Sequence, residues 1–432
     1  MKLLRKEEGC LQKRKQQIYE QILAVLDLSR DMQDEELQNC IEKQILEAGK
    51  QYYLSIDEKC RLQKELFHKI RGLDIIEELL EENEITEIMI NGYQHIFFEK
   101  KGKLYLWEKS FESEEKLRVL IQQMAAGANR MVNEANPITD TRLPDGSRVN
   151  IVLPPVALDG PVVTIRKFFK DNLTLYHMIE SGMLTKEAAQ FLICLVKAGY
   201  NLFISGGTGS GKTTFLNALS AYIPSEERII TIEDAAELRI QNVPNLVRLE
   251  VRNANVEGCS AVTIRDLIKT ALRMRPDRII VGEVRGAEAI DMIQAMNTGH
   301  DGSLSTGHAN SPGDMLARLE TMILLEKEIP LLAIRKQIAS AVDIIVQLGR
   351  LRDGTRHVLE IAEVLGCVEG EIELNRLFFF EEEVGADEDK VVGALKKVSE
   401  LICFQKLKKA GIVRRENYDN MIHIGMENVS GL

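Results

Sequence analysis

The sequence predicts an α/β chain in which a parallel sheet flanked by helices follows a smaller α+β domain and a helical N-terminal region. Three observations predict this division. From about Leu175 onward, strand-like runs alternate with helical segments, which is the pattern of a parallel α/β sheet. Between Leu73 and Phe169, short β-prone runs surround one helical stretch. Residues 1–70 are rich in Lys, Glu, Gln and Leu and contain no proline, which favours helices.

Length and composition indicate a folded chain of two or three domains. The 432 residues are 45% apolar and 28% charged, enough apolar material for a sizeable core. The net charge of −11 argues against a protein that coats nucleic acid, so we expect no direct nucleic-acid partner. No uninterrupted apolar run reaches the ~18 residues of a membrane span, and the first residues lack a signal-peptide core. We therefore expect no transmembrane segment.

Cysteine usage indicates a reducing compartment. The chain has seven cysteines, an odd number, and no pair has C-x-x-C spacing. A disulfide framework and a zinc site are both poor interpretations of that spacing, whereas free thiols in the cytoplasm are a good one.

The N-terminal region is predicted to be a small helical bundle. Apolar residues between Ile18 and Leu28 recur at intervals of three and four, and further helices are expected over Glu36–Leu46 and Ile56–Ile70. The charged residues would lie outside. The simplest interpretation is a solvated helical appendage without chemistry of its own.

The middle region is predicted to alternate strands with one helix. Turn residues at Asn91-Gly92 and Lys101-Gly102 separate its first β-prone runs. The expected strands are Glu87–Ile90, Ile96–Glu99, Leu104–Leu106, Ser147–Leu153 and Val162–Phe168, and the expected helix is Glu114–Asn129.

The C-terminal part contains the expected parallel sheet. Its predicted strands include Leu202–Ile204, Arg228–Ile232 and the wholly apolar Arg278–Val281, which is typical of a central strand buried on both faces. Ser311 before Pro312 predicts the start of a helix. Beyond Ile361 the chain becomes acidic, and we expect a solvated face or loop there.

A glycine-rich turn follows the predicted strand Leu202–Ile204 and precedes a predicted helix, the context that supports a P-loop. It satisfies G-x-x-x-x-G-K-[ST]. In such a loop, backbone N–H groups surround phosphate oxygens, the lysine reaches the β- and γ-phosphates, and a threonine hydroxyl ligates Mg²⁺. The residues of the loop are Gly206, Gly207, Thr208, Gly209, Ser210, Gly211, Lys212, Thr213 and Thr214.

Two carboxylates lie at the ends of predicted strands. Glu233 follows one apolar run and Glu283 follows another. Ligands of open α/β sheets bind beyond the carboxyl ends of the strands, so both side chains should converge on the same edge as the P-loop. These positions suit acids that hold a metal or prepare a water molecule.

His300 and His308 flank a short strand-like run, Gly302–Thr306. No third ligand of matching spacing accompanies them, so a metal pair is a poor interpretation. Contact with a γ-phosphate and a purely structural role both remain open from spacing alone.

Several ordered motifs resemble one family. The sequence is similar to the type II/type IV secretion ATPases (GspE/PulE-like), in particular to the CpaF branch that serves Flp/Tad-type pili, over roughly Gly72–Val364. The Thr231–Leu238 run resembles the Asp box of the family, Arg275–Gly286 its Walker B motif and Thr298–Ser311 its His box. The other matching segments are Ile88–Gly92, Arg142–Asn150, Leu158–Lys167 and the P-loop.

The resemblance implies a particular architecture and activity. It implies a homo-hexameric ring of subunits, each with a PAS-like α+β domain joined to a RecA-like motor domain, and ATP bound between the two. It also implies a Mg²⁺-dependent ATPase that acts at the cytoplasmic face of the inner membrane on platform proteins of a pilus or secretion machine. The expected parts are a helical region at 1–70, the PAS-like domain at 71–172, the motor domain at 173–364 and an acidic, helical extension at 365–432.

The resemblance also implies roles for individual residues. Glu233 would orient or deprotonate the attacking water, Glu283 would bind Mg²⁺ with Thr213, and His308 would sense the γ-phosphate. Arg142 and Arg148 resemble arginines of the N-terminal domain that reach the nucleotide. The family divides the general-base role between the two glutamates, so that choice stays open.

Departures from the family refine the prediction. Gly307 stands where many relatives have leucine, which changes little. The four-cysteine zinc module of the general secretory branch is missing, which favours the CpaF-like branch. The absence of an Asn/Thr-Lys-x-Asp guanine motif favours ATP over GTP.

Two other functions compete with an ATPase motor. One is a nucleotide-gated scaffold that binds ATP and regulates a partner with little hydrolysis. Carboxylates and a histidine at three strand ends favour the enzyme, because a pure binder does not need them. The other is a P-loop kinase or helicase, which the N-terminal α+β domain and its Arg-Leu-Pro-Asp-Gly run make a weaker interpretation. The sequence does not distinguish pilus extension from retraction or from export of protein or DNA.

Overall fold

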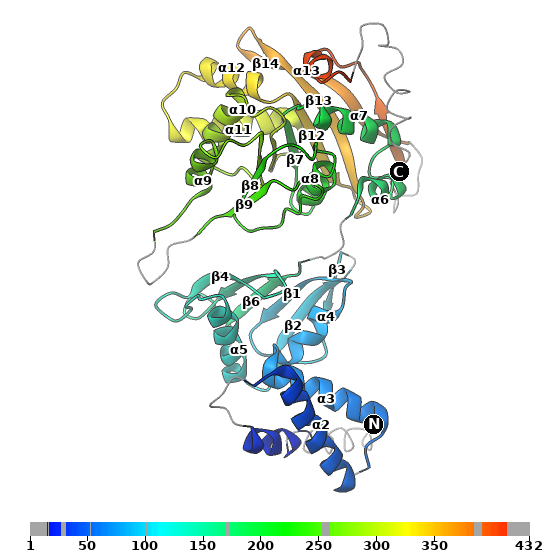
Figure 1. The fold of residues 1–432 in the computed structure, drawn as a ribbon, viewed down its shortest axis with the longest axis vertical. Helices are drawn as coiled ribbons and strands as arrows, with labels where there is room; N and C mark the ends of the chain where they lie inside the picture. The colour runs from blue at the N-terminus through cyan, green and yellow to red at the C-terminus, as the bar shows by residue number, and fades with distance from the viewer. Residues whose placement is uncertain are drawn as a thin grey trace. The chain divides into compact units, whose positions relative to one another are not determined.

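The computed structural model describes residues 15, 17–26, 32–51, 53–100, 102–168, 173–252, 260–383 and 391–412. The chain divides into two compact units, Met1–Phe169 and Lys170–Leu432, each built around a sheet of its own (Figure 1).

The first unit begins with helices that share a separate core. Residues 17–25, α2 (Asp34–Gln51) and α3 (Ile56–Arg71) bury apolar side chains against one another, among them Ile22, Ile41 and Leu66. A capping box at Ser55 fixes the start of α3. The helices predicted over Glu36–Leu46 and Ile56–Ile70 are confirmed.

An antiparallel sheet follows these helices. Its six strands lie in the order β3-β2-β1-β6-β5-β4. The strands are β1 (Ile85–Asn91), β2 (His95–Lys100), β3 (Lys103–Leu106), β4 (Ile138–Arg142), β5 (Arg148–Val152) and β6 (Val162–Arg166). The helical elements are η1 (Asp74–Ile76), α4 (Glu77–Glu81) and α5 (Glu114–Gly127). Strand β4 was not predicted, because its sequence Ile-Thr-Asp-Thr-Arg has no apolar run and depends on pairing with β5.

The two faces of this sheet differ in character. Val149 and Ile165, which are direct neighbours across β5 and β6, belong to one core with Leu117 and Ile121 of α5. Side chains alternate along a strand, so the flanking residues point to the opposite face. Arg148 lies on that face, directly between Arg142 of β4 and Arg166 of β6. The three arginines therefore form a row across three strands, and we call it the arginine row.

The second unit contains a nine-stranded sheet in the order β15-β14-β13-β12-β7-β11-β10-β8-β9. The strands from β12 to β9 in this order are parallel to one another. These are β7 (Leu202–Gly206), β8 (Ile229–Glu233), β9 (Leu246–Glu250), β10 (Arg278–Val281), β11 (Leu304–Gly307) and β12 (Ile344–Arg350). The strand order places β7 between β11 and β12, so the P-loop lies centrally on the sheet.

Helices cover both faces of this sheet. Helices α6, α7 and α8 pack on one face with side chains such as Ile204, and α9 to α12 pack on the other with side chains such as Phe203. Their bounds are α6 (Leu175–Glu180), α7 (Lys186–Lys197), α8 (Lys212–Ser220), α9 (Ile264–Ala271), α10 (Glu288–Asn297), α11 (Pro312–Glu326) and α12 (Leu331–Ala341). Burial on both faces explains why β7, β8, β10 and β11 are buried at every position. The α/β fold class predicted for this unit is confirmed.

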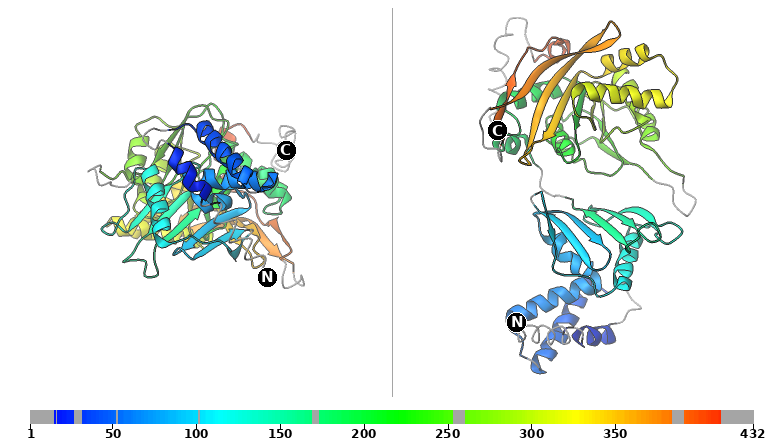
Figure 2. Two further views of the ribbon diagram at one scale, coloured as in Figure 1. Left: turned by 90° about the horizontal axis from the view of Figure 1, so that it is seen from below. Right: turned by 180° about the vertical axis from the view of Figure 1, so that it is seen from behind.

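The acidic tail does not form the solvated face or loop predicted for it. Strands β13 (Arg356–Val368), β14 (Glu371–Glu382) and β15 (Gly393–Lys397) extend the sheet by antiparallel pairing, and α13 (Gln405–Lys409) follows (Figure 2). Acidic and apolar residues alternate over Glu371–Leu374 at the start of β14, and Leu377 and Phe378 further along the strand are buried. The boundary expected after Val364 falls inside β13.

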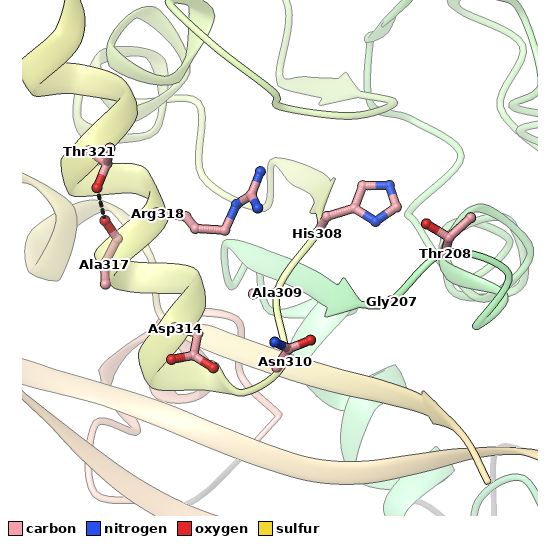
Figure 3. A pocket seen from close by; sticks show the side chains of 9 residues that line it. All are labelled: Gly207, Thr208, His308, Ala309, Asn310, Asp314, Ala317, Arg318 and Thr321. Atoms are coloured by element: carbon pink, nitrogen blue, oxygen red, sulfur yellow. Dashed lines mark hydrogen bonds between the residues drawn. The ribbon is translucent and has the colours of Figure 1, made fainter. Parts of the chain in front are cut away.

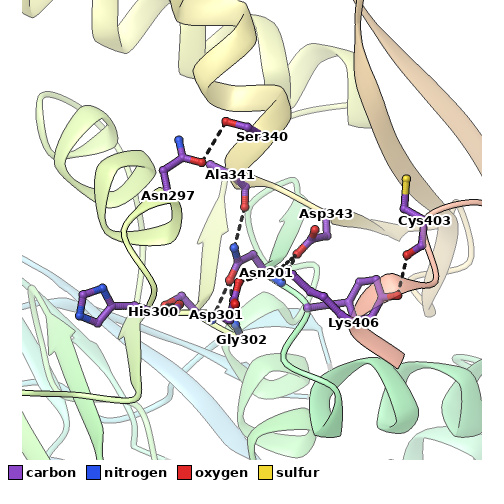
Figure 4. Close-up of polar contacts among 12 residues, drawn as sticks. Asn201, Asn297, His300, Asp301, Gly302, Ser340, Ala341, Asp343, Cys403 and Lys406 are labelled. Atoms are coloured by element: carbon purple, nitrogen blue, oxygen red, sulfur yellow. Dashed lines mark hydrogen bonds and ion pairs between the residues drawn. The ribbon is translucent and has the colours of Figure 1, made fainter. Parts of the chain in front are cut away.

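A polar network closes the amino ends of the parallel strands (Figure 4). The Asn201 amide oxygen accepts the N–H groups of Gly302 and Ser303 at 2.8 and 3.0 Å, and its amide nitrogen donates to a carbonyl of α12 at 2.7 Å. Lys406 of α13 forms ion pairs with Asp301 at 2.8 Å and Asp343 at 2.7 Å. These contacts fasten the C-terminal helix to the sheet.

Neither a membrane-spanning helix nor a disulfide occurs in the described residues. None of their helices combines the length and the apolar character that a span needs. The described cysteines are free thiols, namely Cys40, Cys60, Cys194, Cys367 and Cys403.

Candidate nucleotide-binding site

The P-loop connects the end of β7 to the start of α8. Gly211 caps α8 with a φ of 91°, a left-handed conformation that side chains disfavour. Gly206 lies so close to β12 that a Cβ there would be 2.6 Å from the Leu348 carbonyl oxygen. Glycine is therefore required at both ends of the turn. The turn leads into the N-terminus of a nine-residue helix, whose N–H groups and positive dipole suit a phosphate.

Lys212 is held over this turn by the loop itself. It is 8% exposed, and its Nζ donates to the carbonyl oxygens of Gly206 at 3.0 Å and Gly207 at 2.9 Å. The same Nζ lies 3.3 Å from Nδ1 of His308, which directly follows β11. The ammonium is thus placed beside the phosphate cradle and next to His308.

Glu283 lies two residues beyond β10 and contacts two cationic groups. Its Oε1 lies 3.0 Å from His308 Nε2 and 2.7 Å from Arg285 Nε, and its Oε2 accepts a hydrogen bond from Arg285 Nη2 at 2.8 Å. The side chains after β7, β10 and β11 therefore form a continuous chain from Lys212 through His308 to Glu283. Of the two carboxylates expected at the P-loop edge, Glu283 is linked to Lys212 of the P-loop through His308.

Glu233, the last residue of β8, lies beside the Glu283 segment. A Cβ on Gly282 would be 3.0 Å from the Glu233 Cγ, so the two chains are in contact. Oε2 of Glu233 accepts the backbone N–H groups of Glu237 and Leu238 at 2.6 and 2.7 Å. The carboxylate thereby fixes the loop after β8.

Burial and neighbouring charges separate the pKa values of these groups. Burial raises the pKa of Glu233 and outweighs its backbone hydrogen bonds. Burial also acts to raise the pKa of Glu283, but the hydrogen bond and charge of Arg285, with the charges of His308 and Lys212, lower it overall. Burial lowers the pKa of His308, and the charge of Lys212 adds to this. A neutral His308 can accept from Lys212 at Nδ1 and present its Nε2 proton to Glu283.

The residues expected to hold Mg²⁺ fit a hard cation. The carboxylate of Glu283 offers the oxygen ligand that Mg²⁺ prefers, and its buried Oε1 would bind the ion in place of its contact with Arg285 or His308. Thr213 lies on the first turn of α8, where its hydroxyl adjoins the phosphate cradle. Among the described residues no group of three His, Cys, Asp or Glu side chains could hold a metal ion.

The structure places the remaining predicted residues elsewhere. Arg142 and Arg148 lie in the first unit, opposite each other in the arginine row. His300 precedes β11, whereas His308 follows it, and His300 Nδ1 lies 3.2 Å from the Ala295 carbonyl oxygen. The two histidines are thus at opposite ends of one strand, and only His308 belongs to the phosphate edge.

Sequence analysis missed three arginines near the site. Arg285 follows Glu283 by two residues, a signal that could have been used. Arg356 of β13 donates from Nε to the Gly209 carbonyl oxygen at 2.8 Å, and only the pairing of distant strands brings it there. Arg318 of α11 lines a pocket beside His308 (Figure 3). No sequence pattern marks the last two.

Comparison with known proteins identifies the family of this chain. The model of a family described as type II/IV secretion system protein matches residues 69–426. A Mycobacterium tuberculosis protein named for conjugal transfer is 38% identical over 311 residues, which cover 71% of this chain and 88% of that protein. The type IV secretion system protein VirB11 of Bartonella quintana is 33% identical over 329 residues, 67% of this chain and 91% of that protein.

Among solved structures, the VirB11 ATPase of the Brucella suis type IV secretion system, crystallised with sulphate, is 30% identical. It covers 67% of this chain and 96% of its own, with a TM-score of 0.37. The family match extends over most of the chain and includes the P-loop, both strand-end glutamates and His308. The chain therefore belongs to the type II/IV secretion ATPase family.

Proposed function

We propose that this chain is a Mg²⁺-dependent ATPase whose hydrolysis of ATP drives a pilus or secretion machine, as the motor of a Flp/Tad-type (CpaF-like) system. The observation that carries the proposal is the contact chain from Lys212 through His308 to Glu283. A nucleotide-binding module needs the P-loop, but it does not need a histidine and a half-buried acid arranged behind it.

The residues have distinct chemical tasks in this proposal. Backbone N–H groups of the P-loop and Lys212 bind the phosphates, and Lys212 leaves its own loop carbonyls to do so. Glu233, with its raised pKa, accepts a proton from the attacking water. His308, whose Nδ1 lies toward Lys212 and whose Nε2 lies toward Glu283, would sense the γ-phosphate by exchanging one of these contacts for it. Mg²⁺, held by Thr213 and Glu283, would neutralise charge on the phosphates.

The arginine row would act on the same nucleotide from the first unit. Arg142, Arg148 and Arg166 bring three guanidinium groups together on one face of the sheet, and guanidinium groups bind phosphate through paired N–H groups. We expect Arg148→Ala, and Arg142→Ala to a smaller degree, to lower turnover more than ATP affinity. An isolated second unit that hydrolyses ATP as fast as the full chain would contradict this role.

The organisation of the machine extends the proposal. A homo-hexamer of subunits, each with a helical region, a PAS-like domain, a RecA-like motor domain and a C-terminal extension, would work on platform proteins at the cytoplasmic face of the inner membrane. Genes for a pilin, a prepilin peptidase and platform proteins beside this one would support the Flp/Tad assignment. Activity per subunit should rise with protein concentration, and a monomer with full activity would contradict the ring.

One observation favours the scaffold as a second candidate. Both acids are engaged by protein groups, Glu233 by two backbone N–H groups and Glu283 by Arg285. If neither carboxylate leaves these contacts when ATP binds, the chain binds ATP without hydrolysing it.

The test uses the purified full chain. Phosphate release from ATP is measured with and without Mg²⁺, with Lys212→Ala as the matched control. If the chain is an ATPase motor, its Mg²⁺-dependent release of phosphate from ATP is well above that of Lys212→Ala. ATP binding with release no faster than in the variant would leave the scaffold as the function.

A further inference from the structure

A cavity of about 560 Å³ adjoins the P-loop on the side of His308 (Figure 3). Gly207 and Thr208 form its inner wall, and the segment after β11 forms its floor. The outer wall is one face of α11 and includes Asp314 and Arg318. A water molecule occupies about 30 Å³, so the cavity holds a small hydrated ion as well as ordered water.

Arg318 is an uncommitted cation in this cavity. Its side chain is exposed, and within the described part of the chain nothing forms a hydrogen bond or ion pair with it. Figure 3 shows the guanidinium reaching from α11 toward the His308 ring. Arg318 and His308 therefore line the same cavity.

The cavity adjoins the residues to which the proposed function assigns the γ-phosphate. Lys212 of a P-loop reaches the β- and γ-phosphates, and His308 lies 3.3 Å from Lys212 Nζ at the cavity wall. In hydrolysis, the water oxygen forms a bond to the γ-phosphorus, the bond to the bridging oxygen breaks, and the electron pair of that bond stays on ADP. The released phosphate is then closed in by ADP on one side and open to this cavity on the other.

We propose that this cavity is a transient binding site for inorganic phosphate leaving the enzyme, with Arg318 as its cationic ligand. The inference rests on the proposed ATPase function. An arginine binds phosphate through paired N–H groups, and Asn310 adds an amide to the lining. Asp314, one helical turn from Arg318, repels the dianion from the outer wall. One cation and one opposing carboxylate give a weak site, which suits passage rather than storage.

The direct test is binding of inorganic phosphate to the full chain loaded with ADP and Mg²⁺, followed by phosphorus NMR or calorimetry. We expect Arg318→Gln to weaken this binding about fivefold, the scale of one solvent-exposed charge interaction. Ala317→Phe, which fills the cavity without changing charge, should weaken it as well. Arg273→Gln, on the loop after α9, is the matched control and should bind phosphate as the native chain does.

Equal phosphate affinity in the native chain and Arg318→Gln would overturn the proposal, as would the absence of phosphate binding to the ADP-loaded native chain. Arg318 is exposed on α11, so its replacement should not unfold the protein, and a thermal melt of each variant verifies this.

A second measurement separates the exit site from the γ-phosphate position. ADP with aluminium fluoride occupies the transfer position itself, and its affinity should be unchanged in Arg318→Gln. A parallel loss of both affinities would make Arg318 a ligand of the transferred phosphate and overturn the exit role.

The outcome also distinguishes failure of this inference from failure of the proposed function. If phosphate binds through Arg318 but the chain does not hydrolyse ATP, the proposed ATPase function and the phosphate-exit role are both wrong. The cavity is then only an anion-binding site. If the chain hydrolyses ATP and neither Arg318→Gln nor Ala317→Phe changes phosphate release, the ATPase function stands and only the exit role is wrong.

Discussion

The two ends of the parallel strands in the second unit differ in how their polar groups are satisfied. At the amino ends, Asn201 uses its amide oxygen, its amide nitrogen and its backbone N–H in contacts of 2.7–3.0 Å. At the carboxyl ends, the ionisable groups contact one another, with His308 3.3 Å from Lys212 and 3.0 Å from Glu283. The buried hydrogen bonds of Asn201 stabilise the fold, whereas Lys212, His308 and Glu283 are groups that can exchange their contacts for a ligand. The amino ends of the strands therefore contribute mainly to stability, and the carboxyl ends carry the residues of the proposed chemistry.

Lys212→Ala should break activity at the carboxyl end without harming the fold. Loss of the ammonium removes charge stabilisation from the β- and γ-phosphates, so we expect hydrolysis to fall by about 10³-fold or more. The thermal midpoint should stay within a few degrees of native, because the contacts of Lys212 are to its own loop. Steady-state kinetics and circular dichroism measure both, and substantial unfolding would show that the carboxyl end also carries stability.

Glu233→Gln should separate the two acids at the same edge. If Glu233 is the general base, kcat falls by about 10²–10⁴-fold while ATP affinity is kept. Glutamine keeps an oxygen that can accept the N–H groups of Glu237 and Leu238, so the loop after β8 is maintained. Glu283→Gln is the comparison variant. Near-native turnover in the Glu233 variant would assign the base to Glu283.

Asn201→Ala should show the opposite behaviour at the amino end. Asn201 is buried, and its loss leaves the N–H groups of Gly302 and Ser303 without their acceptor. We expect a loss of about 2–4 kcal/mol in the free energy of unfolding, since each unsatisfied buried group costs about 1–3 kcal/mol. Denaturant unfolding measures this loss. Turnover below the transition should remain near native, and a large fall in kcat without destabilisation would show that the two ends are coupled.

Much of this site follows from local sequence, and the rest depends on long-range pairing. The P-loop, the acids at strand ends and the Ser311 cap each follow from a few consecutive residues with a single physical function. Arg356 could not be predicted, because it reaches Gly209 only after β12 pairs with β7 and β13 with β12. Strands β14 and β15 were not predicted, because the acidic residues of this segment indicated a solvated loop. Their strand conformation depends on pairing with a neighbouring strand, which local sequence does not show.

The smallest predicted effect concerns Asp353, which lies after β12 at the carboxyl end of the parallel strands. Unlike the residues of the site, its carboxylate is held by hydrogen bonds within its own turn and to Val391. The hydroxyl and N–H of Thr355 and the N–H of Val391 donate to its carboxylate and hold its pKa at about 2, below its ordinary 3.8. A lowered pKa gives stability that is present above pH 3.8 and is lost as the pH falls through about 2. We expect the stability difference between native protein and Asp353→Asn to shrink as the pH is lowered from 5 toward 3. Denaturant unfolding across that range checks this, and a constant difference would show that the charge does not matter.

The position of β7 in the sheet has a consequence for synthesis on the ribosome. Its two neighbours are β11 and β12, whose first residues, Leu304 and Ile344, pair with Leu202 from more than 100 residues downstream. The first unit needs nothing from later sequence to complete its own sheet, because all six strands lie before residue 170. At ~5–20 residues per second, β7 waits about 5–20 seconds before either neighbour is made. The P-loop strand, apolar on both faces, is therefore a segment of the nascent chain that needs chaperone protection, while the unit ahead of it can already be folded.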